Sequence, residues 1–112
     1  MVISGKRAGA ERIAAVLVPT DRRADVNNAI KRLLDVRKCS FHPHERAVTE
    51  TGMEYGGITP IGLPADWRLL VDSGVGDIEF CVIGSGVRRS KLIVPGPVLL
   101  QLPSAEVESI TL

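Results

Sequence analysis

The sequence places Cys39, His42 and His44 within six positions, a spacing that could begin a metal site or form a nucleophile and its base. Thiolates and imidazoles are common zinc ligands, and a histidine can activate a cysteine for attack. On an extended strand, however, Cys39 and His42 point to opposite faces, and Pro43 interrupts the strand. No other Cys/His group completes four ligands. We therefore expect no metal, and interpret the histidines as surface residues at the start of a helix.

Glycine-rich loops that bind nucleotides follow fixed patterns, which this chain does not match. Gly84-Ser85-Gly86 begins like a dinucleotide fingerprint, but Arg89 stands where the third glycine should be. A phosphate loop ending in Gly-Lys-Ser/Thr is also missing. Dinucleotide-binding and ATPase functions are therefore excluded, and we expect no cofactor.

A different loop, Gly56-Gly57-Ile58-Thr59-Pro60, has residue types suited to holding a ligand by its backbone. The two glycines permit a positive φ and close approach, while the proline fixes the exit of the loop. Its N–H groups could hold a carbonyl oxygen or a ribose hydroxyl, or stabilise charge that develops on an ester carbonyl. Taken alone, the same pattern also fits a plain tight turn.

Regular elements must position this loop. Ile13–Val18 is a continuous aliphatic run closed by Pro19, which predicts a buried strand at the centre of a sheet. Thr20 and Asp21 are good helix caps, and the apolar spacing that follows predicts a helix over 22–34.

Further elements are predicted along the rest of the chain. They are a strand at 38–41, a helix at 45–51 stopped by Gly52, a long loop at 52–64, strands at 69–71, 79–83 and 92–94, a short helix near 98–102 and a strand near 107–112. This order indicates an α+β fold, a mixed sheet with helices to one side.

Length and composition indicate a single domain spanning residues 1–112. The chain is 45% hydrophobic and 24% charged with a net charge of +1, a balance typical of folded proteins. Its longest apolar run has six residues, whereas a membrane span needs about twenty. Lys6, Arg7 and Glu11 interrupt any signal peptide. Two cysteines without a CxxC pattern suit a reducing compartment, so we expect a cytoplasmic protein with no membrane partner.

The small net charge conceals an asymmetry. Residues 1–46 contain ten Lys and Arg against five acids, and residues 47–112 contain four against eight. Such an excess can contact phosphates, although it also fits an ordinary solvated helix face. On the predicted helix, Lys31 and Arg32 belong to this excess.

The motifs together resemble a known family. The run GMEYGGITPIGLP, the strand Leu69–Asp72 and the segment Val82–Gly86 resemble, in order and spacing, the YbaK family of aminoacyl-tRNA deacylases. These are relatives of the editing domain inserted in bacterial prolyl-tRNA synthetases. The resemblance covers nearly the whole chain, and it implies a mixed, curved β-sheet with flanking helices.

The resemblance also implies an activity and a site. The activity is hydrolysis of the ester that links a wrong amino acid to tRNA, in a pocket without metal or cofactor. The 3′-terminal adenosine would lie against the glycine-proline loop, with Asp72 and the 84–86 turn at the pocket wall. The implied roles are catalytic for Gly56, Gly57, Pro60 and Asp72, substrate-binding for Ile58, Thr59, Gly84, Ser85 and Gly86, and tRNA-binding for Lys31 and Arg32.

One family feature has no counterpart in the sequence. The functional lysine of the family lies on a strand that would immediately precede Val2 and Ile3, so its position falls before Met1. The chain is then a fragment, the product of a misassigned start or a shortened member, and we expect poor hydrolysis from it. Lys6, in a predicted turn at 5–9, is expected to face water.

Two functions therefore remain open. The first is a deacylase that acts through backbone donors and a positioned water. The second is a module that binds an aminoacyl-tRNA end or a protein without turnover. The expected partners are the 3′ aminoacyl end of tRNA and either prolyl-tRNA synthetase or a second copy of the chain, while the amino acid removed stays open.

Overall fold

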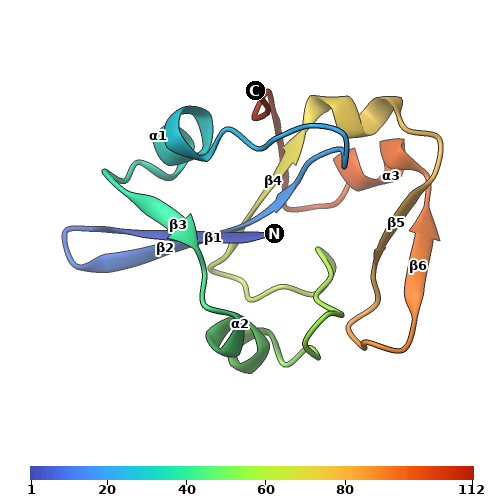
Figure 1. Cartoon of the computed structure of the whole chain (residues 1–112), viewed down its shortest axis with the longest axis horizontal. Coiled ribbons are helices and arrows are strands. Elements are labelled where there is room, and N and C mark those ends of the chain that lie inside the picture. The colour runs from blue at the N-terminus through green and yellow to red at the C-terminus, as the bar shows by residue number, and fades with distance from the viewer.

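A computed structural model describes all residues, 1–112, and contains a five-stranded mixed sheet in the order β3-β1-β2-β4-β7 (Figure 1). The strands are β1 (Val2–Arg7), β2 (Ala10–Leu17), β3 (Cys39–Phe41), β4 (Arg68–Asp72) and β7 (Ala105–Glu108). β1 is antiparallel to both β2 and β3, whereas β4 runs parallel to both β2 and β7. The expected α+β fold with a mixed sheet is confirmed.

β2 lies in the middle of this sheet, as its sequence predicts. Its residues Ile13–Val16 are all buried, because the strand has neighbours at both edges and is covered on both faces. A strand covered on both faces reads as a continuous apolar run rather than an alternating one.

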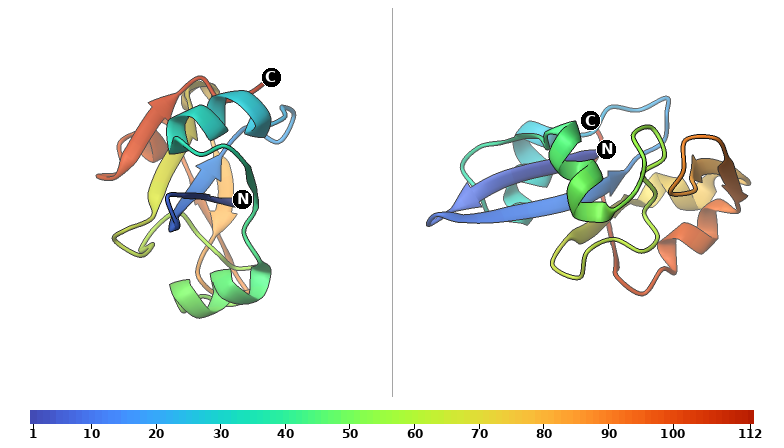
Figure 2. Two further views of the ribbon diagram at one scale, coloured as in Figure 1. Left: turned by 90° about the vertical axis from the view of Figure 1, so that its left-hand side faces the viewer. Right: turned by 90° about the horizontal axis from the view of Figure 1, so that it is seen from below.

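The helices cover both faces of the sheet, so the expectation of helices to one side is wrong (Figure 2). On one face, η1 (Val26–Ile30) and α1 (Lys31–Leu34) pack on Ile3, Val16 and Leu70. On the other, η2 (Ser73–Asp77) and α3 (Gly96–Leu100) pack on Leu69 and Val71. The physical reason is that the central strands are apolar on both faces and need two covers.

The remaining helix, α2 (His44–Thr51), packs through Ala47 on Ile13 and Trp67. It ends at Gly52, whose φ of 71° lies in the left-handed region that glycine adopts without strain, as predicted.

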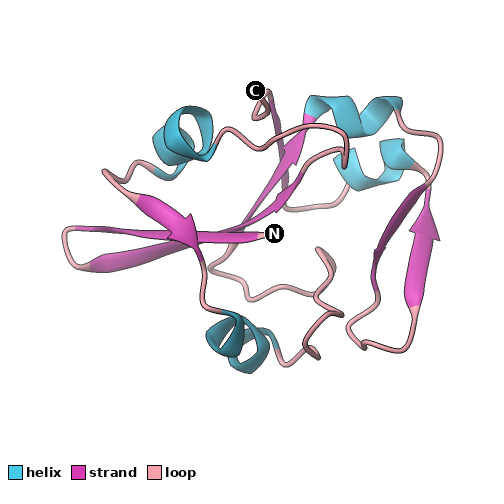
Figure 3. Cartoon of the chain, in the orientation of Figure 1, coloured by secondary structure: helices cyan, strands magenta, loops and turns pink.

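A separate two-stranded ribbon, β5 (Cys81–Gly84) and β6 (Lys91–Val94), stands beside the sheet (Figure 3). Both strands were expected, although β5 begins two residues later than the predicted 79–83. The long loop at 52–64 contains no regular element, which confirms that prediction.

Several other elements differ from the sequence predictions: η2 was not expected, and α3 begins at Gly96 and not near residue 98. β1 was not expected, and the predicted turn at 5–9 is narrower: Lys6 lies in β1, and Ala8 and Gly9 make the turn with positive φ. The predicted helix 22–34 begins only at Val26, because residues 23–25 pair with the end of the chain through the bonds from Leu112 N to Arg23 O and from Asp25 N to Ile110 O. The last strand is accordingly earlier, at 105–108.

None of the helices combines the length and the hydropathy that crossing a lipid bilayer requires.

Candidate functional site

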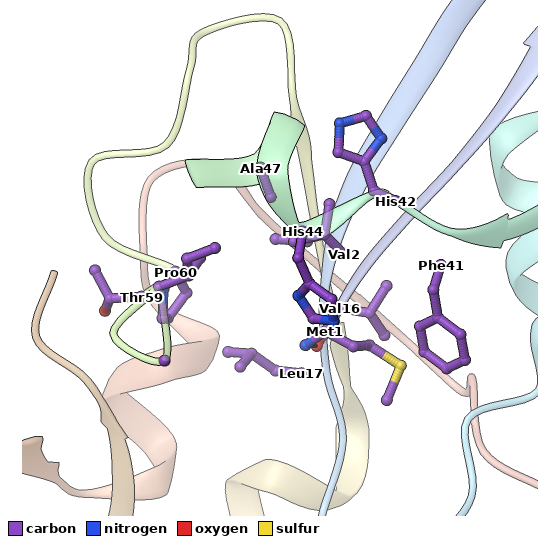
Figure 4. Close-up of a pocket in the computed structure, with 13 residues that line it drawn as sticks. Met1, Val2, Val16, Leu17, Phe41, His42, His44, Ala47, Thr59 and Pro60 are labelled. Atoms are coloured by element: carbon purple, nitrogen blue, oxygen red, sulfur yellow. Dashed lines mark hydrogen bonds between the residues drawn. The ribbon is translucent and has the colours of Figure 1, made fainter. Parts of the chain in front are cut away.

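The principal cavity, of about 540 Å³, lies between the sheet and the glycine-proline loop (Figure 4). The sheet contributes the start of β1 and the end of β2, and the β3–α2 junction forms the side wall. Eight of the thirteen lining residues are hydrophobic, so the cavity suits an apolar group with a few polar contacts. The lining residues are Met1, Val2, Ala15, Val16, Leu17, Phe41, His42, His44, Ala47, Gly56, Ile58, Thr59 and Pro60.

The β5–β6 turn holds the loop in place from behind. Glu54 N donates to Gly86 O at 3.0 Å, and Gly86 N donates to Gly57 O at 2.7 Å. Arg88 N donates to the Glu54 carboxylate at 2.9 Å, and the ammonium of Lys91 donates to Gly56 O at 2.8 Å. The shape of the loop is therefore fixed by the hairpin.

Two glycines permit this close packing. A Cβ on Gly57 would lie 2.5 Å from the Val87 carbonyl carbon, and one on Gly84 would lie 2.3 Å from Ile58 O. From the sequence, Gly57 was expected to permit a ligand to approach the loop closely. That interpretation is wrong, because the space beside Gly57 is occupied by the backbone of the hairpin.

Two backbone amides of the loop remain free. Gly56 N and Ile58 N donate no hydrogen bond within the protein, and both residues line the cavity. Gly57 N is used by Glu54 O at 2.9 Å, and Pro60 has no N–H to donate. A carbonyl or hydroxyl oxygen bound at the loop would therefore find two unoccupied donors.

The Thr59 hydroxyl is the one buried side-chain polar group in the protein without a hydrogen-bond partner. Thr59 is only 6% exposed and is one of the residues that line the cavity. An unsatisfied buried hydroxyl costs about 1–3 kcal/mol. Its oxygen has no exposed surface in the free protein, so a bound molecule would reach it only after the Thr59 side chain turned toward the cavity.

His42 is buried, with only 3% of its surface exposed, so the prediction that it is a surface residue is wrong. Its Nδ1 lies 2.9 Å from Ser4 Oγ, and its Nε2 lies 2.5 Å from Glu50 Oε1. These bonds tie β1, the β3–α2 junction and α2 together. The bond from His42, followed by that from Arg46, lowers the pKa of Glu50. Because both of its ring nitrogens are hydrogen-bonded within the protein, His42 forms part of the cavity wall.

His44 is exposed at the rim of the same cavity, and its ring packs edge-on against Tyr55 with centroids 5.4 Å apart. Neither ring nitrogen has a hydrogen-bond partner in the protein, and Figure 4 shows the ring directed toward Met1. It is the titratable side chain of the cavity that a ligand could meet. Cys39 lies elsewhere, with its thiol against Val26 O, and no group of three or more His, Cys, Asp or Glu side chains could hold a metal ion.

The comparisons with known proteins fit this geometry. The family model for aminoacyl-tRNA editing domains matches residues 1–102, which include the whole cavity and its loop. The chain belongs to the aminoacyl-tRNA editing domain family.

Solved structures share the editing-domain fold. The hypothetical protein APE2540 superposes with a TM-score of 0.82 at 25% identity, covering 99% of this chain and 71% of that one. A candidate trans-editing enzyme for prolyl-tRNA synthetase superposes with a TM-score of 0.77 at 22% identity, covering 99% and 67%. No curated protein matches the chain.

Within the editing domain, Asp72 lies apart from the cavity. It is 2% exposed, and its two carboxylate oxygens accept from Ile110 N at 3.0 Å and Gly74 N at 2.9 Å. The expectation that Asp72 lines the pocket is therefore wrong, because β4 ends beside the chain terminus and η2. The position of Asp72 in the sequence was ambiguous, since an aspartate that follows a strand can also cap the next helix.

Gly84, Ser85 and Gly86 do not line the cavity either, because they form the end of β5 and the start of the hairpin turn, which pack against the glycine-proline loop. The Ser85 hydroxyl is bonded within that turn, 2.7 Å from Ser90 Oγ. Lys31 and Arg32 lie on α1, and Lys31 lines a second, polar cavity. Of the predicted site residues, the structure brings together Gly56, Ile58, Thr59 and Pro60.

Proposed function

We propose that the protein hydrolyses the ester of mischarged aminoacyl-tRNA, as a deacylase of the YbaK type that acts in trans. The observation that carries the proposal is the cavity under the Gly56–Pro60 loop, a largely apolar chamber lined by two residues whose amides are free and by Thr59, whose buried hydroxyl has no partner. Its volume of about 540 Å³ suits a small amino acid joined to a terminal ribose.

In the proposed reaction, water attacks the ester carbonyl, the bond from the carbonyl carbon to the ribose oxygen breaks, and that oxygen receives the proton. The free amides of Gly56 and Ile58 donate to the oxygen that becomes negative. Donors fixed in advance in a water-poor site are worth about 3–4 kcal/mol of barrier. The amino acid side chain packs on the apolar wall, and the Thr59 hydroxyl, once its side chain turns toward the cavity, bonds the ribose or the α-amino group.

The remaining site residues act through the architecture of the loop. Gly57 and Pro60 set its shape, and Gly84, Ser85 and Gly86 support it from the hairpin. Asp72 fixes the end of β4 against the chain terminus. Lys31 and Arg32 contact phosphates of the tRNA.

A second function is favoured by one observation. Both oxygens of Asp72, the carboxylate expected to act in the pocket, are bonded to backbone amides. A cavity without a free carboxylate suits a module that holds the aminoacyl end without turnover.

Partners and location follow from the proposed substrate. Charged tRNA is made in the cytoplasm, where the two free thiols of Cys39 and Cys81 also persist. Prolyl-tRNA synthetase, or a second copy of the chain, is the proposed protein partner.

The test is release of amino acid from tRNA that prolyl-tRNA synthetase has mischarged with alanine, cysteine or serine. Acceleration over buffer that falls in Thr59→Val and persists in Thr59→Ser supports a deacylase. Tight binding of a non-hydrolysable aminoacyl-adenosine without acceleration supports the binding module instead.

A further inference from the structure

A second groove, of about 530 Å³, borders the edge strand β3 and is almost entirely polar. One of its ten lining residues is hydrophobic. Its walls come from β1, from Glu11 at the start of β2, from β3 with the residues before it, and from η1 and α1. Four of its side chains are cationic: Lys6, Lys31, Arg37 and Lys38.

The positive charge of this groove is not compensated. None of the four cations forms a salt bridge in the protein. The single acid of the lining, Glu11, is bound by both terminal nitrogens of Arg46, at 2.7 and 2.5 Å. A cluster of like charges repels itself unless counterions or a polyanionic ligand neutralise it.

The groove and the principal cavity are lined by neighbouring residues of the same two strands. Along β1, Val2 lines the cavity and Ser4 lines the groove, and along β3, Phe41 lines the cavity and Ser40 lines the groove. Successive residues of a strand are only about 3.3 Å apart. A chain molecule that leaves the cavity along β1 and β3 therefore has only about two residues of strand to cross before it reaches the groove.

An aromatic ring marks the junction. Phe41 is 67% exposed although it is a large apolar residue at the wall of the cavity. Exposed aromatic rings beside cationic grooves bind single-stranded nucleic acids, because any base can stack on the ring while the cations bind the backbone. An acidic protein segment would use the cations but would have no need of the ring.

We propose that this groove is the track of the RNA strand that leads to the 3′ end, with its phosphates on Lys6, Lys31, Arg37 and Lys38 and one base stacked on Phe41. The proposal rests on the proposed function, which places the aminoacyl end in the principal cavity. It adds the direction of the strand and a contact set that includes β1 and β3 as well as α1.

The test measures binding of uncharged tRNA by fluorescence anisotropy over a range of salt concentrations. The groove variant is Arg37→Glu with Lys38→Glu. The matched control is Arg22→Glu with Arg23→Glu, an equal change of charge on exposed cations that form no ion pair and lie outside the groove. All four side chains are exposed, and circular dichroism verifies that both variants fold.

The groove variant is expected to bind at least about tenfold more weakly at low salt, and its plot of log K against log salt should be shallower by about 1.4, the contribution of two single-strand phosphate contacts. The control should keep the slope of the parent protein. Phe41→Ala should weaken binding without changing the slope. Phe41→Trp, which keeps an aromatic ring, should bind tRNA as tightly as the parent protein.

Equal slopes for the groove variant and the control would overturn the proposal, and so would full affinity in Phe41→Ala. Failure of the proposed function gives a different result. If the protein hydrolyses no mischarged tRNA but shows the expected difference in slope, the RNA track is supported and the proposed deacylase activity is rejected. If the protein hydrolyses mischarged tRNA but the groove variant and the control have equal slopes, only the RNA track is rejected.

Discussion

A β-carbon placed on Gly57 would lie 2.5 Å from the carbonyl carbon of Val87, closer than real Cβ contacts occur. The glycine-proline loop and the β5–β6 hairpin are therefore in backbone contact at this point. The cavity depends on that contact, because its free amides come from residues on either side of Gly57.

We expect Gly57→Val to destabilise the protein by about 3 kcal/mol or more, since neither backbone can move without breaking hydrogen bonds. Gly62→Asn is the control. Gly62 lies in the same loop with a φ of 78° and nothing within 4 Å of an added Cβ, so asparagine should cost no more than about 1 kcal/mol. Denaturant unfolding measures both, and equal stabilities would disprove the backbone contact.

Thr59→Val should leave the free protein as stable as before or more stable by about 1 kcal/mol, because it removes a buried hydroxyl without a partner. It should nevertheless reduce kcat/KM for deacylation by about tenfold, the value of one lost hydrogen bond to substrate. Thr59→Ser keeps the hydroxyl and serves as the control. A marked loss of stability in Thr59→Val would show that the hydroxyl has a partner in the free protein.

Glu50 makes the stability depend on pH. Its pKa is lowered in the folded protein, first by the bond from His42 and then by Arg46, whereas the unfolded chain has the ordinary value of 4.5. Its contribution is therefore present above pH 4.5 and is lost as pH falls through the lower, folded-state value.

Thermal unfolding of Glu50→Gln and of the parent protein between pH 3 and pH 7 measures this contribution. The parent should have the higher Tm at pH 7, and the two values should converge at the acid end. A difference that stays constant over the whole range would mean that the charge of Glu50 does not contribute.

Asp72→Asn separates a structural role from a catalytic one. An amide has one acceptor oxygen where the carboxylate has two, so either Gly74 N or Ile110 N loses its partner. We expect a loss of about 1–3 kcal/mol of stability, with the deacylation rate of the folded variant within about threefold of the parent. Full stability combined with complete loss of turnover would make Asp72 catalytic.

Much of the fold could be predicted because single segments determine it. The run Ile13–Val16 is apolar on both faces and becomes the central strand, and Gly52 ends α2 in a left-handed conformation. β1 was missed because its outer end, with Lys6 and Arg7, is polar, and only pairing with β2 and β3 makes it a strand.

The site was predictable only in part, for the same reason. The loop with Gly56 and Thr59 is contiguous in sequence, and it does line the cavity. The bond between His42 and Glu50, and the capture of Asp72 by Ile110 N, join residues that the fold brings together. A local sequence pattern does not indicate such pairs, because the fold and not the pattern brings the two residues together. The cationic groove combines β1, α1 and the residues before β3, so the basic excess in the sequence included its cations but did not show that they line one groove.

The most direct measurement is the single-turnover rate of amino acid release from mischarged tRNA, with the protein in excess. The account predicts release faster than spontaneous hydrolysis, a reduction of about tenfold in Thr59→Val, and the parent rate in Thr59→Ser. Release at the spontaneous rate by a folded protein that binds a non-hydrolysable aminoacyl-adenosine in this cavity would contradict the proposed deacylase activity.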